Sequence, residues 1–135
     1  RPMPPHPGAM LTPVLQVAIG GALGAVLRYA VGVGVLRMFG AGGFPLGVLT
    51  VNVVGSFLMG VFVVVAAQRG LTHLQPLVLT GILGGFTTFS AFSLEAVSLW
   101  ERGDVGQAAV YVGLSVALSI LALVAGLWLA RGLLA

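Results

Sequence analysis

The sequence has no lysine and no cysteine, and its 135 residues carry three acids against six arginines. Without cysteine, the chain can form neither disulfides nor thiolate metal sites. The arginines are scattered singly, which gives little support to a nucleic-acid partner. Only 7% of the residues are charged while 59% are hydrophobic, which is far too apolar for a soluble domain of this length. The composition therefore predicts an integral membrane protein.

Four long apolar runs dominate the chain, and each is at least as long as the roughly 20 residues that a helix needs to cross the hydrocarbon core. The runs cover about residues 14–36, 46–67, 74–100 and 105–130. Because the bilayer offers no water to the backbone, we expect an all-α fold with four transmembrane helices in residues 12–135. Residues 1–11 are proline-rich and are expected to form a disordered extension. Thr12 and Pro13 are typical of an N-cap and a first helical residue.

The arginines are divided almost evenly between the two ends of these helices. With four spans, one side carries three arginines and the other carries two, namely Arg1, Arg69 and Arg131 against Arg37 and Arg102. So weak a bias leaves two readings open: a fixed orientation, or a chain that inserts both ways and forms antiparallel dimers. Small-residue pairs such as Gly20/Gly24 and Gly81/Gly85 suit close packing within or between subunits. We expect an oligomer.

Polar side chains recur at helical spacing in the second and fourth runs. Asn52 and Ser56 lie four residues apart and share a helix face. An amide in the membrane is costly unless it faces protein or water. Asn52 therefore either forms a hydrogen bond between helices or belongs to a polar pathway. Tyr111, Ser115 and Ser119 form a similar stripe, although serines can instead bond to their own helix.

The third run contains GGFTTFSAFS, residues 84–93, in which glycines, threonines and phenylalanines are mixed. Paired glycines and β-branched threonines both weaken a helix, so we expect the third helix to be broken in mid-membrane. Backbone groups freed by a break are tolerated only in a protein-lined or wet interior, where freed carbonyls can hold a cation. The alternative is a packed kink in which the phenylalanines are ordinary core.

The polar side chains in the middle of the four runs are neutral hydrogen-bonding groups. No acid stands in the middle of a run, and Glu95 comes nearest. Cation and proton transporters usually need an intramembrane carboxylate, whereas amides, hydroxyls and electropositive ring edges suit a small anion. Arg28 either snorkels to the interface or draws anions into a vestibule, and Glu95 either faces water there or pairs with an arginine. With His6 and His73 outside the runs and no nucleophile–base pair, an enzyme is not expected.

Three stretches resemble the signatures of the Fluc/CrcB family of fluoride channels: GGALGAVLRY (residues 20–29), GVLTVNVVGSFLMG (residues 47–60) and GILGGFTTFSAFSLE (residues 81–95). The resemblance spans the whole four-helix length. It implies an antiparallel, dual-topology homodimer in the bacterial inner membrane. Two pathways through such a dimer would export fluoride passively from the cytoplasm and lower its concentration in the cell.

The resemblance also implies roles for individual residues. The implied fluoride pathway is Asn52, Phe89, Ser90, Phe92, Tyr111, Ser115 and Ser119. The backbone carbonyls of Gly84 and Thr87, from both subunits, would hold one structural sodium ion on the two-fold axis. Family members commonly have threonine where this chain has Val48 and Ala91, and these departures are expected to slow conduction or alter selectivity.

Two other membrane functions fit part of the pattern. A small multidrug-type, proton-coupled exporter would also be a short, four-helix, dual-topology dimer. Such exporters have a glutamate in the first span, and this first run has no acid. A structural membrane subunit would explain the glycines, but it would not explain Asn52, the phenylalanine pair and the serine stripe together.

Overall fold

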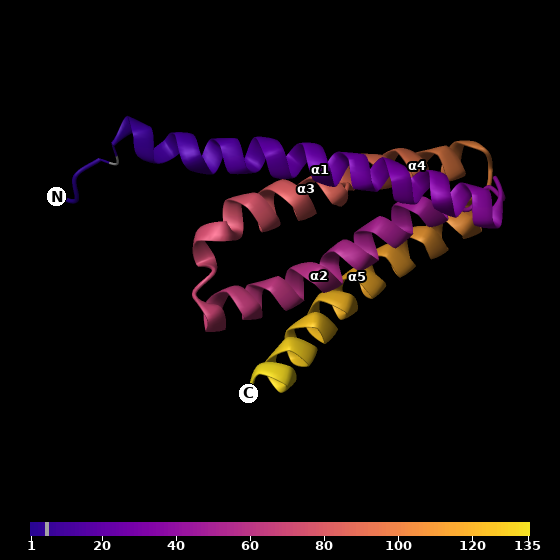
Figure 1. Ribbon diagram of the computed structural model, residues 1–135. Coiled ribbons are helices and arrows are strands. Elements are labelled where there is room, and N and C mark those ends of the chain that lie inside the picture. The colour runs from indigo at the N-terminus through magenta and orange to yellow at the C-terminus, as the bar shows by residue number, and fades with distance from the viewer. Residues whose placement is uncertain (5) are drawn as a thin grey trace.

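The computed structural model describes residues 1–4 and 6–135 (Figure 1). Its elements are α1 (Pro7–Phe39), α2 (Leu46–Arg69), the 3₁₀ turn η1 (Thr72–Leu74), the π-helical segment η2 (Pro76–Leu83), α3 (Gly84–Phe86), α4 (Phe89–Glu101) and α5 (Val105–Leu134). Four helical stretches are long and apolar enough to cross a membrane: Gly8–Phe39, Leu46–Arg69, Thr72–Glu101 and Val105–Leu134. The prediction of an all-helical chain with four such stretches is confirmed. The third stretch, from η1 to α4, is called the third span below.

The first helix begins earlier than the sequence predicts. α1 begins at Pro7, and His6 is its N-cap, with Nδ1 accepting a backbone hydrogen bond at 3.4 Å. The prediction of an N-cap at Thr12 is therefore wrong, because this earlier cap lets the helix run through that position. Of the disordered extension expected over residues 1–11, the part from Pro7 onward is helical, and Pro5 lies outside the described residues. The division into an extension and a channel domain stays a prediction.

The helices form two pairs that meet at one end and diverge toward the other (Figure 1). α1 packs along η2 and α3, and α2 packs along α5. The connectors after α1 and α4 lie at the closed end, while both termini and the connector after α2 lie at the open end. Gly70 ends α2 in the left-handed conformation with φ 68°, which glycine adopts without the strain that a β-carbon brings.

Glycines let the backbones of the paired helices touch. A β-carbon added at Gly20 or Gly24 would overlap carbonyl oxygens of η2. One added at Gly85 would stand 2.6 Å from the Gly21 carbonyl oxygen of α1. α2 and α5 meet in the same way at Gly60. These small residues therefore pack within one subunit, which is one of the two arrangements that the sequence left open.

The core is small and lies toward the closed end. Its one cluster of buried residues is formed by Leu99, Ala108 and Tyr111 within the described part of the chain, with Phe44, Val48, Leu49, Phe92 and Ala96 packed against them. Other buried apolar residues lie between the helices, among them Val51, Val64 and Leu83. Large apolar side chains cover the outer faces of the helices instead: Val26 is 65% exposed and Leu121 is 63% exposed. So apolar an outer surface suits lipid or a further membrane subunit rather than water.

Candidate functional site

The helical path of the third span is interrupted at Thr87 and Thr88. Thr87 has φ −87° and ψ 158°, and Thr88 has φ −151° and ψ 119°, so both are extended between α3 and α4. Gly84 and Gly85 stay helical in α3. The sequence indicates a weak helix over the glycines and threonines together. In the structure the interruption lies at the threonines, and Gly85 serves the close packing on α1.

The two threonine hydroxyls stabilise the helix ends on either side. Thr87 Oγ1 donates to the Leu83 carbonyl at 2.8 Å, in the last turn of the first half. Thr88 is the N-cap of α4, where its Oγ1 accepts a hydrogen bond from the Ala91 amide at 3.1 Å. Threonine caps helices because its hydroxyl satisfies an amide that has no helical partner. Hydroxyl groups that bond to the nearby backbone compete with the hydrogen bonds of a continuous helix. Here that bonding marks where α3 ends and where α4 begins.

Asn52 of α2 binds this extended segment from the neighbouring helix. Its Oδ1 accepts a hydrogen bond from the Thr88 amide at 2.7 Å, and its Nδ2 donates to the Thr88 carbonyl at 3.0 Å. The side-chain amide thus pairs with the backbone much as a neighbouring β-strand would. The helix-to-helix hydrogen bond that the sequence left open for Asn52 is present. The second Nδ2 hydrogen is left for another acceptor.

A groove of about 380 Å³ runs beside the extended segment, between α2, α4 and α5. Its lining residues are Asn52, Gly55, Ser56, Met59, Thr87, Thr88, Phe89, Phe92, Ser115, Val116, Ser119 and Ile120. We call it the hydroxyl groove, because its polar side chains are one amide and five hydroxyl residues. None of the lining side chains is charged, so the groove offers only neutral donors and acceptors.

Most of the pathway residues predicted from the sequence meet in the hydroxyl groove. Those that line it are Asn52, Phe89, Phe92, Ser115 and Ser119. Ser90 and Tyr111 do not line it. Ser90 is exposed, and its Oγ lies 3.3 Å from Thr88 Oγ1. Tyr111 is buried against Phe92, and the roles of Ser90 and Tyr111 in a pathway stay predictions.

A row of aromatic rings leads from this groove into the core. The ring centroids of Phe89 and Phe92 are 5.4 Å apart, and those of Phe92 and Tyr111 are 5.3 Å apart. Phe44 packs edge-on against Tyr111, with ring centroids 5.6 Å apart and an interplanar angle of 90°. Phe89 is 79% exposed whereas Tyr111 is fully buried. The electropositive ring edges are therefore presented at successive depths.

Two hydroxyls near this row are buried and have no hydrogen-bond partner among the described residues, Tyr111 Oη and Ser115 Oγ. The alternative that the serines bond to their own helix is therefore wrong for Ser115. Ser93 does make such a bond, since its Oγ donates to the Phe89 carbonyl at 2.9 Å. Leaving a buried hydroxyl unpaired costs about 1–3 kcal/mol, so groups like these mark a place where a further partner fits.

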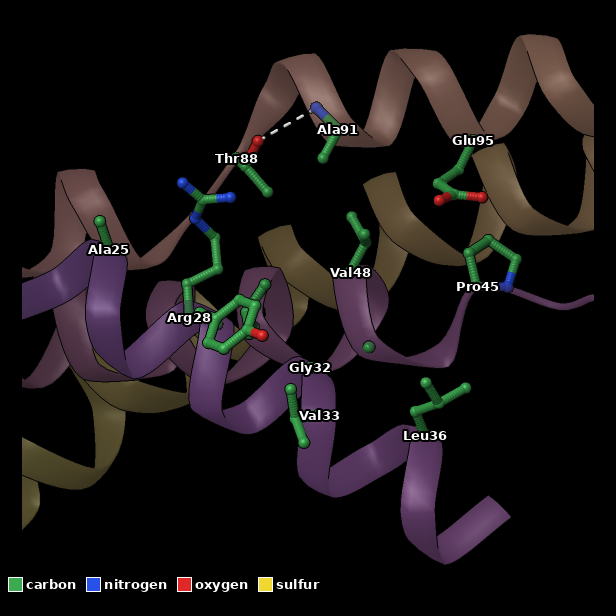
Figure 2. Close-up of a pocket in the computed structure, with 13 residues that line it drawn as sticks. Ala25, Arg28, Gly32, Val33, Leu36, Pro45, Val48, Thr88, Ala91 and Glu95 are labelled. Atoms are coloured by element: carbon green, nitrogen blue, oxygen red, sulfur yellow. Dashed lines mark hydrogen bonds between the residues drawn. The ribbon is translucent and has the colours of Figure 1, made fainter. Parts of the chain in front are cut away.

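A second groove, of about 470 Å³, meets the first at Thr88, which lines both. Figure 2 shows Arg28 at one end and Glu95 at the other, with Val48 and Ala91 between them. We call it the Arg28 groove. The two residues predicted for a vestibule thus share one cavity. Both departures from the family pattern line the same space.

Arg28 reaches the end of α3 and forms no ion pair with any of the described residues. Its Nε donates to the Gly85 carbonyl at 3.1 Å. Among the described residues, the one ion pair joins Arg102 and Asp104, with Nε and Oδ2 3.6 Å apart. The alternative that Glu95 pairs with an arginine is therefore not found in this part of the chain. Placement of Arg28 and Glu95 in a vestibule stays a prediction.

The carbonyls that were predicted to bind a cation lie at the interruption. In a continuous helix the Thr88 amide would donate to the Gly84 carbonyl, but here it donates to Asn52. The Thr87 carbonyl lies outside both helices, because Thr87 is extended and precedes the N-cap of α4. Carbonyls freed at broken helices are ligands that membrane proteins offer to sodium. The carbonyls of Gly84 and Thr87 therefore fit the chemistry of a sodium ligand, and a sodium site formed by them stays a prediction.

Sequence reasoning left Ser56, Met59 and Thr88 out of the pathway, although all three line the hydroxyl groove. Asn52, Ser56 and Met59 stand at positions i, i+4 and i+7 of α2, so they share one face. Extending the face from Asn52 and Ser56 by one turn would have found Met59. Thr88 could have been found because a threonine directly before a helical segment, here the one that begins at Phe89, is a typical N-cap.

Comparisons with known proteins identify the family of the chain. The family model described as "CrcB-like protein, Camphor Resistance (CrcB)" matches residues 15–127, which is well over half of the chain. A "Fluoride-specific ion channel FluC" from Ruegeria sp. (strain TM1040) is 67% identical over 125 residues, covering 93% of this chain and 99% of its own length. Proteins of the same name from Jannaschia sp. (strain CCS1) and Roseobacter denitrificans (strain ATCC 33942 / OCh 114) are 75% identical over 104 residues and 62% identical over 120 residues. These matches cover 74% and 88% of this chain, and 99% and 95% of the relatives. The chain therefore belongs to the CrcB-like family and is a multi-pass integral membrane protein.

Proposed function

We propose that this protein is a fluoride-selective channel, through which fluoride leaves the cytoplasm passively so that its concentration in the cell falls. Relatives named fluoride-specific ion channels support the identity of the ion. One observation carries the chemistry: an amide, two phenylalanines and two serines from three helical elements converge on a single uncharged groove.

The groove supplies what a small anion needs when it leaves water. Ser115 Oγ in its wall and Tyr111 Oη behind that wall are buried and have no hydrogen-bond partner among the described residues, and Asn52 has a second Nδ2 hydrogen to offer. Hydrogen bonds to an ion are stronger than those between neutral groups, so these donors can replace part of its hydration. The ring edges of Phe89 and Phe92 add partial positive charge without a fixed cation that would trap the ion.

Two antiparallel copies in the bacterial inner membrane form the channel in this proposal, with two pathways. Phe89 is 79% exposed in the single chain, so one wall of the hydroxyl groove stays open for a second copy to cover. The nearly even split of arginines supports insertion in both orientations. The extended segment at Thr87 and Thr88 then lies at membrane depth inside the dimer, where freed backbone groups are tolerated.

A sodium ion on the two-fold axis completes the proposed dimer. The carbonyls of Gly84 and Thr87 from each copy would hold it, and the bound ion would supply a fixed positive charge between the subunits. The part played by the chain itself is to keep these carbonyls out of helical hydrogen bonds. Asn52 does so for Gly84, because it takes the Thr88 amide that would otherwise return to that carbonyl.

Ion efflux from liposomes tests the proposed function. Purified protein is reconstituted into vesicles loaded with fluoride or with chloride. Matched electrodes then follow each ion once the membrane potential that opposes efflux has been dissipated. Rapid loss of fluoride with chloride retained is the expected result. Verified, folded protein that releases neither ion, or that releases both equally, would overturn the proposal of a selective channel.

A further inference from the structure

Two arginines in the chain make the same type of hydrogen bond in different surroundings. Arg28 donates through Nε to the Gly85 carbonyl at 3.1 Å, in a partly buried position. Arg102 donates through Nη2 to the Gly43 carbonyl at 3.0 Å, in an exposed connector. Each glycine is followed by a phenylalanine. The exposed bond provides an internal reference for the one at the interruption.

The Gly85 carbonyl needs a partner because the helix stops. In a continuous helix it would accept from the Phe89 amide. The extended backbone of Thr87 and Thr88 carries that amide away, and Phe89 becomes the first residue of α4. An unpaired carbonyl inside a membrane is costly, since no water can replace the lost donor. Arg28 supplies the missing donor from another helix.

The glycine packing of α1 brings Arg28 to this position. Gly21, Gly24 and Arg28 follow at spacings of three and four residues, so they lie on one face of α1. That face meets the third span so closely that a β-carbon at Gly85 would stand 2.6 Å from the Gly21 carbonyl oxygen. The guanidinium is therefore carried to the end of α3 by a rigid backbone contact rather than by a free side chain.

The charge of Arg28 is also placed where the helix favours it. Within the part of the chain that the structure describes, its guanidinium forms no ion pair. The carboxyl end of a helix carries partial negative charge, which stabilises a nearby cation. Figure 2 shows the guanidinium beside Thr88, at the opposite end of the Arg28 groove from Glu95.

We infer that Arg28 is a positioning residue that fixes the shape of the interruption, in addition to any effect of its charge on anions. It binds one freed carbonyl at the end of α3 while Asn52 binds the amide and carbonyl of Thr88, so the interruption is held from α1 on its α3 side and from α2 at the extended segment. The position of Phe89 and of the carbonyl of Thr87 then depends on Arg28. This inference rests on the proposed channel function for its effect on ion flow, but the contact itself is independent of it.

Lysine separates position from charge, because it keeps the positive charge but lacks the planar guanidinium and its Nε donor. We expect Arg28→Lys to lower fluoride efflux by about tenfold or more, as the loss of a charge-assisted hydrogen bond at the pathway implies. Arg102→Lys is the matched control, since it removes a guanidinium–glycine bond away from both grooves. It should leave efflux unchanged. Unchanged efflux in a folded Arg28→Lys dimer would overturn the inference.

Solid-state NMR in lipid bilayers reads the contact directly. The sequence contains two Gly–Phe pairs, Gly43–Phe44 and Gly85–Phe86, so carbonyl-¹³C glycine with ¹⁵N phenylalanine gives two resolved carbonyl signals. Arg28→Lys should shift only the Gly85 signal, and Arg102→Lys only the Gly43 signal. A loss of efflux with the Gly85 signal unmoved would show that Arg28 acts on ion flow without this carbonyl contact and would overturn the positioning role.

A wild-type measurement covers the case in which Arg28→Lys fails to fold. With ¹⁵N introduced at arginine Nε, the Gly85 carbonyl should lose intensity through dipolar coupling to that nitrogen. Absence of this coupling in the wild-type protein would overturn the inference without any variant. If the wild-type protein shows the coupling but carries no fluoride, the contact stands while the proposed function and the effect on flow both fail.

Discussion

Asn52 and Thr88 are separated by 36 positions in the sequence and exchange two hydrogen bonds between α2 and the third span. One side chain thus takes the place of the helical bonds that the extended segment has lost. Because Thr88 lines both grooves, this pair stands where the hydroxyl groove and the Arg28 groove meet. A change in Asn52 should therefore affect the shape of the backbone and the ion path together.

Asn52→Asp tests this double role. The new carboxylate can still accept from the Thr88 amide, but it has no hydrogen for the Thr88 carbonyl and it adds a negative charge to an anion path. We expect fluoride efflux to fall by about tenfold or more. Gln16→Glu is the control, because it makes the same amide-to-carboxylate change in α1, outside both grooves. Equal losses in the two variants would argue against a specific role for Asn52.

Phe89→Ile and Phe92→Ile remove ring edges from the hydroxyl groove while they keep an apolar side chain. Efflux should drop sharply in both variants, because isoleucine carries no electropositive edge to face an anion. Dimer yield, measured by size-exclusion chromatography, should be retained. Phe39→Ile serves as the control, since Phe39 is 64% exposed near the end of α1 and lines neither groove. Normal efflux from both groove variants would remove the aromatic part of the proposed path.

Features that depend on neighbouring residues could be predicted from the sequence, whereas features that depend on contacts between distant residues could not. Four spans could be predicted because each apolar run is a local property of the chain. The start of α1 was missed, since Thr12 and Pro13 carry the usual signal and His6 does not. The weak helix in the third span was predicted from its composition. Its boundary at Thr88 could not be, because the stabilising partner Asn52 lies on another helix.

Side-chain surroundings were the least predictable feature. The stripe of Tyr111 and Ser115 was visible as a period of four residues, but nothing in that period tells whether a hydroxyl bonds to its own helix. In the structure, Ser115 Oγ does not, and Tyr111 lies behind the groove rather than in its wall. Likewise, Val48 and Ala91 are far apart in sequence, and only the packing of α2 against α4 shows that they share a groove.

Ser115→Ala tests whether the Ser115 hydroxyl serves ion passage or is only an unpaired polar group in the packing. Removing a buried hydroxyl that has no partner among the described residues should leave the free energy of unfolding unchanged or raise it by about 1 kcal/mol. Fluoride efflux should nevertheless fall severalfold, because the anion loses a donor. Ser93→Ala is the matched control, as its hydroxyl already bonds to the Phe89 carbonyl. A more stable Ser115→Ala protein with full efflux would identify the hydroxyl as a defect of packing.

Orientation in the membrane can be tested at the connector between α4 and α5. Adding two lysines between Arg102 and Asp104 should fix that end on the cytoplasmic side, because the present arginine bias is so slight. A chain held in one orientation has no antiparallel partner, so efflux should be lost. Co-expression with a chain biased the other way, by lysines at its termini, should restore it. Full efflux from chains shown by tagging to share one orientation would contradict the antiparallel dimer.

Val48→Thr and Ala91→Thr introduce the threonines that the resemblance to the family leads us to expect at these two positions. Both positions line the Arg28 groove between Arg28 and Glu95, so each new hydroxyl should raise fluoride efflux. Because the two side chains face one cavity, their effects should not be independent, and the double variant should exceed the product of the single ones. Val48 also packs on the buried cluster that contains Tyr111, so dimer yield must be checked for each protein. Fluoride efflux of the two single variants and the double variant, compared as a double-mutant cycle, tests this coupling. Independent effects would mean that Val48 and Ala91 act separately. No effect in any variant would mean that both residues are neutral for conduction.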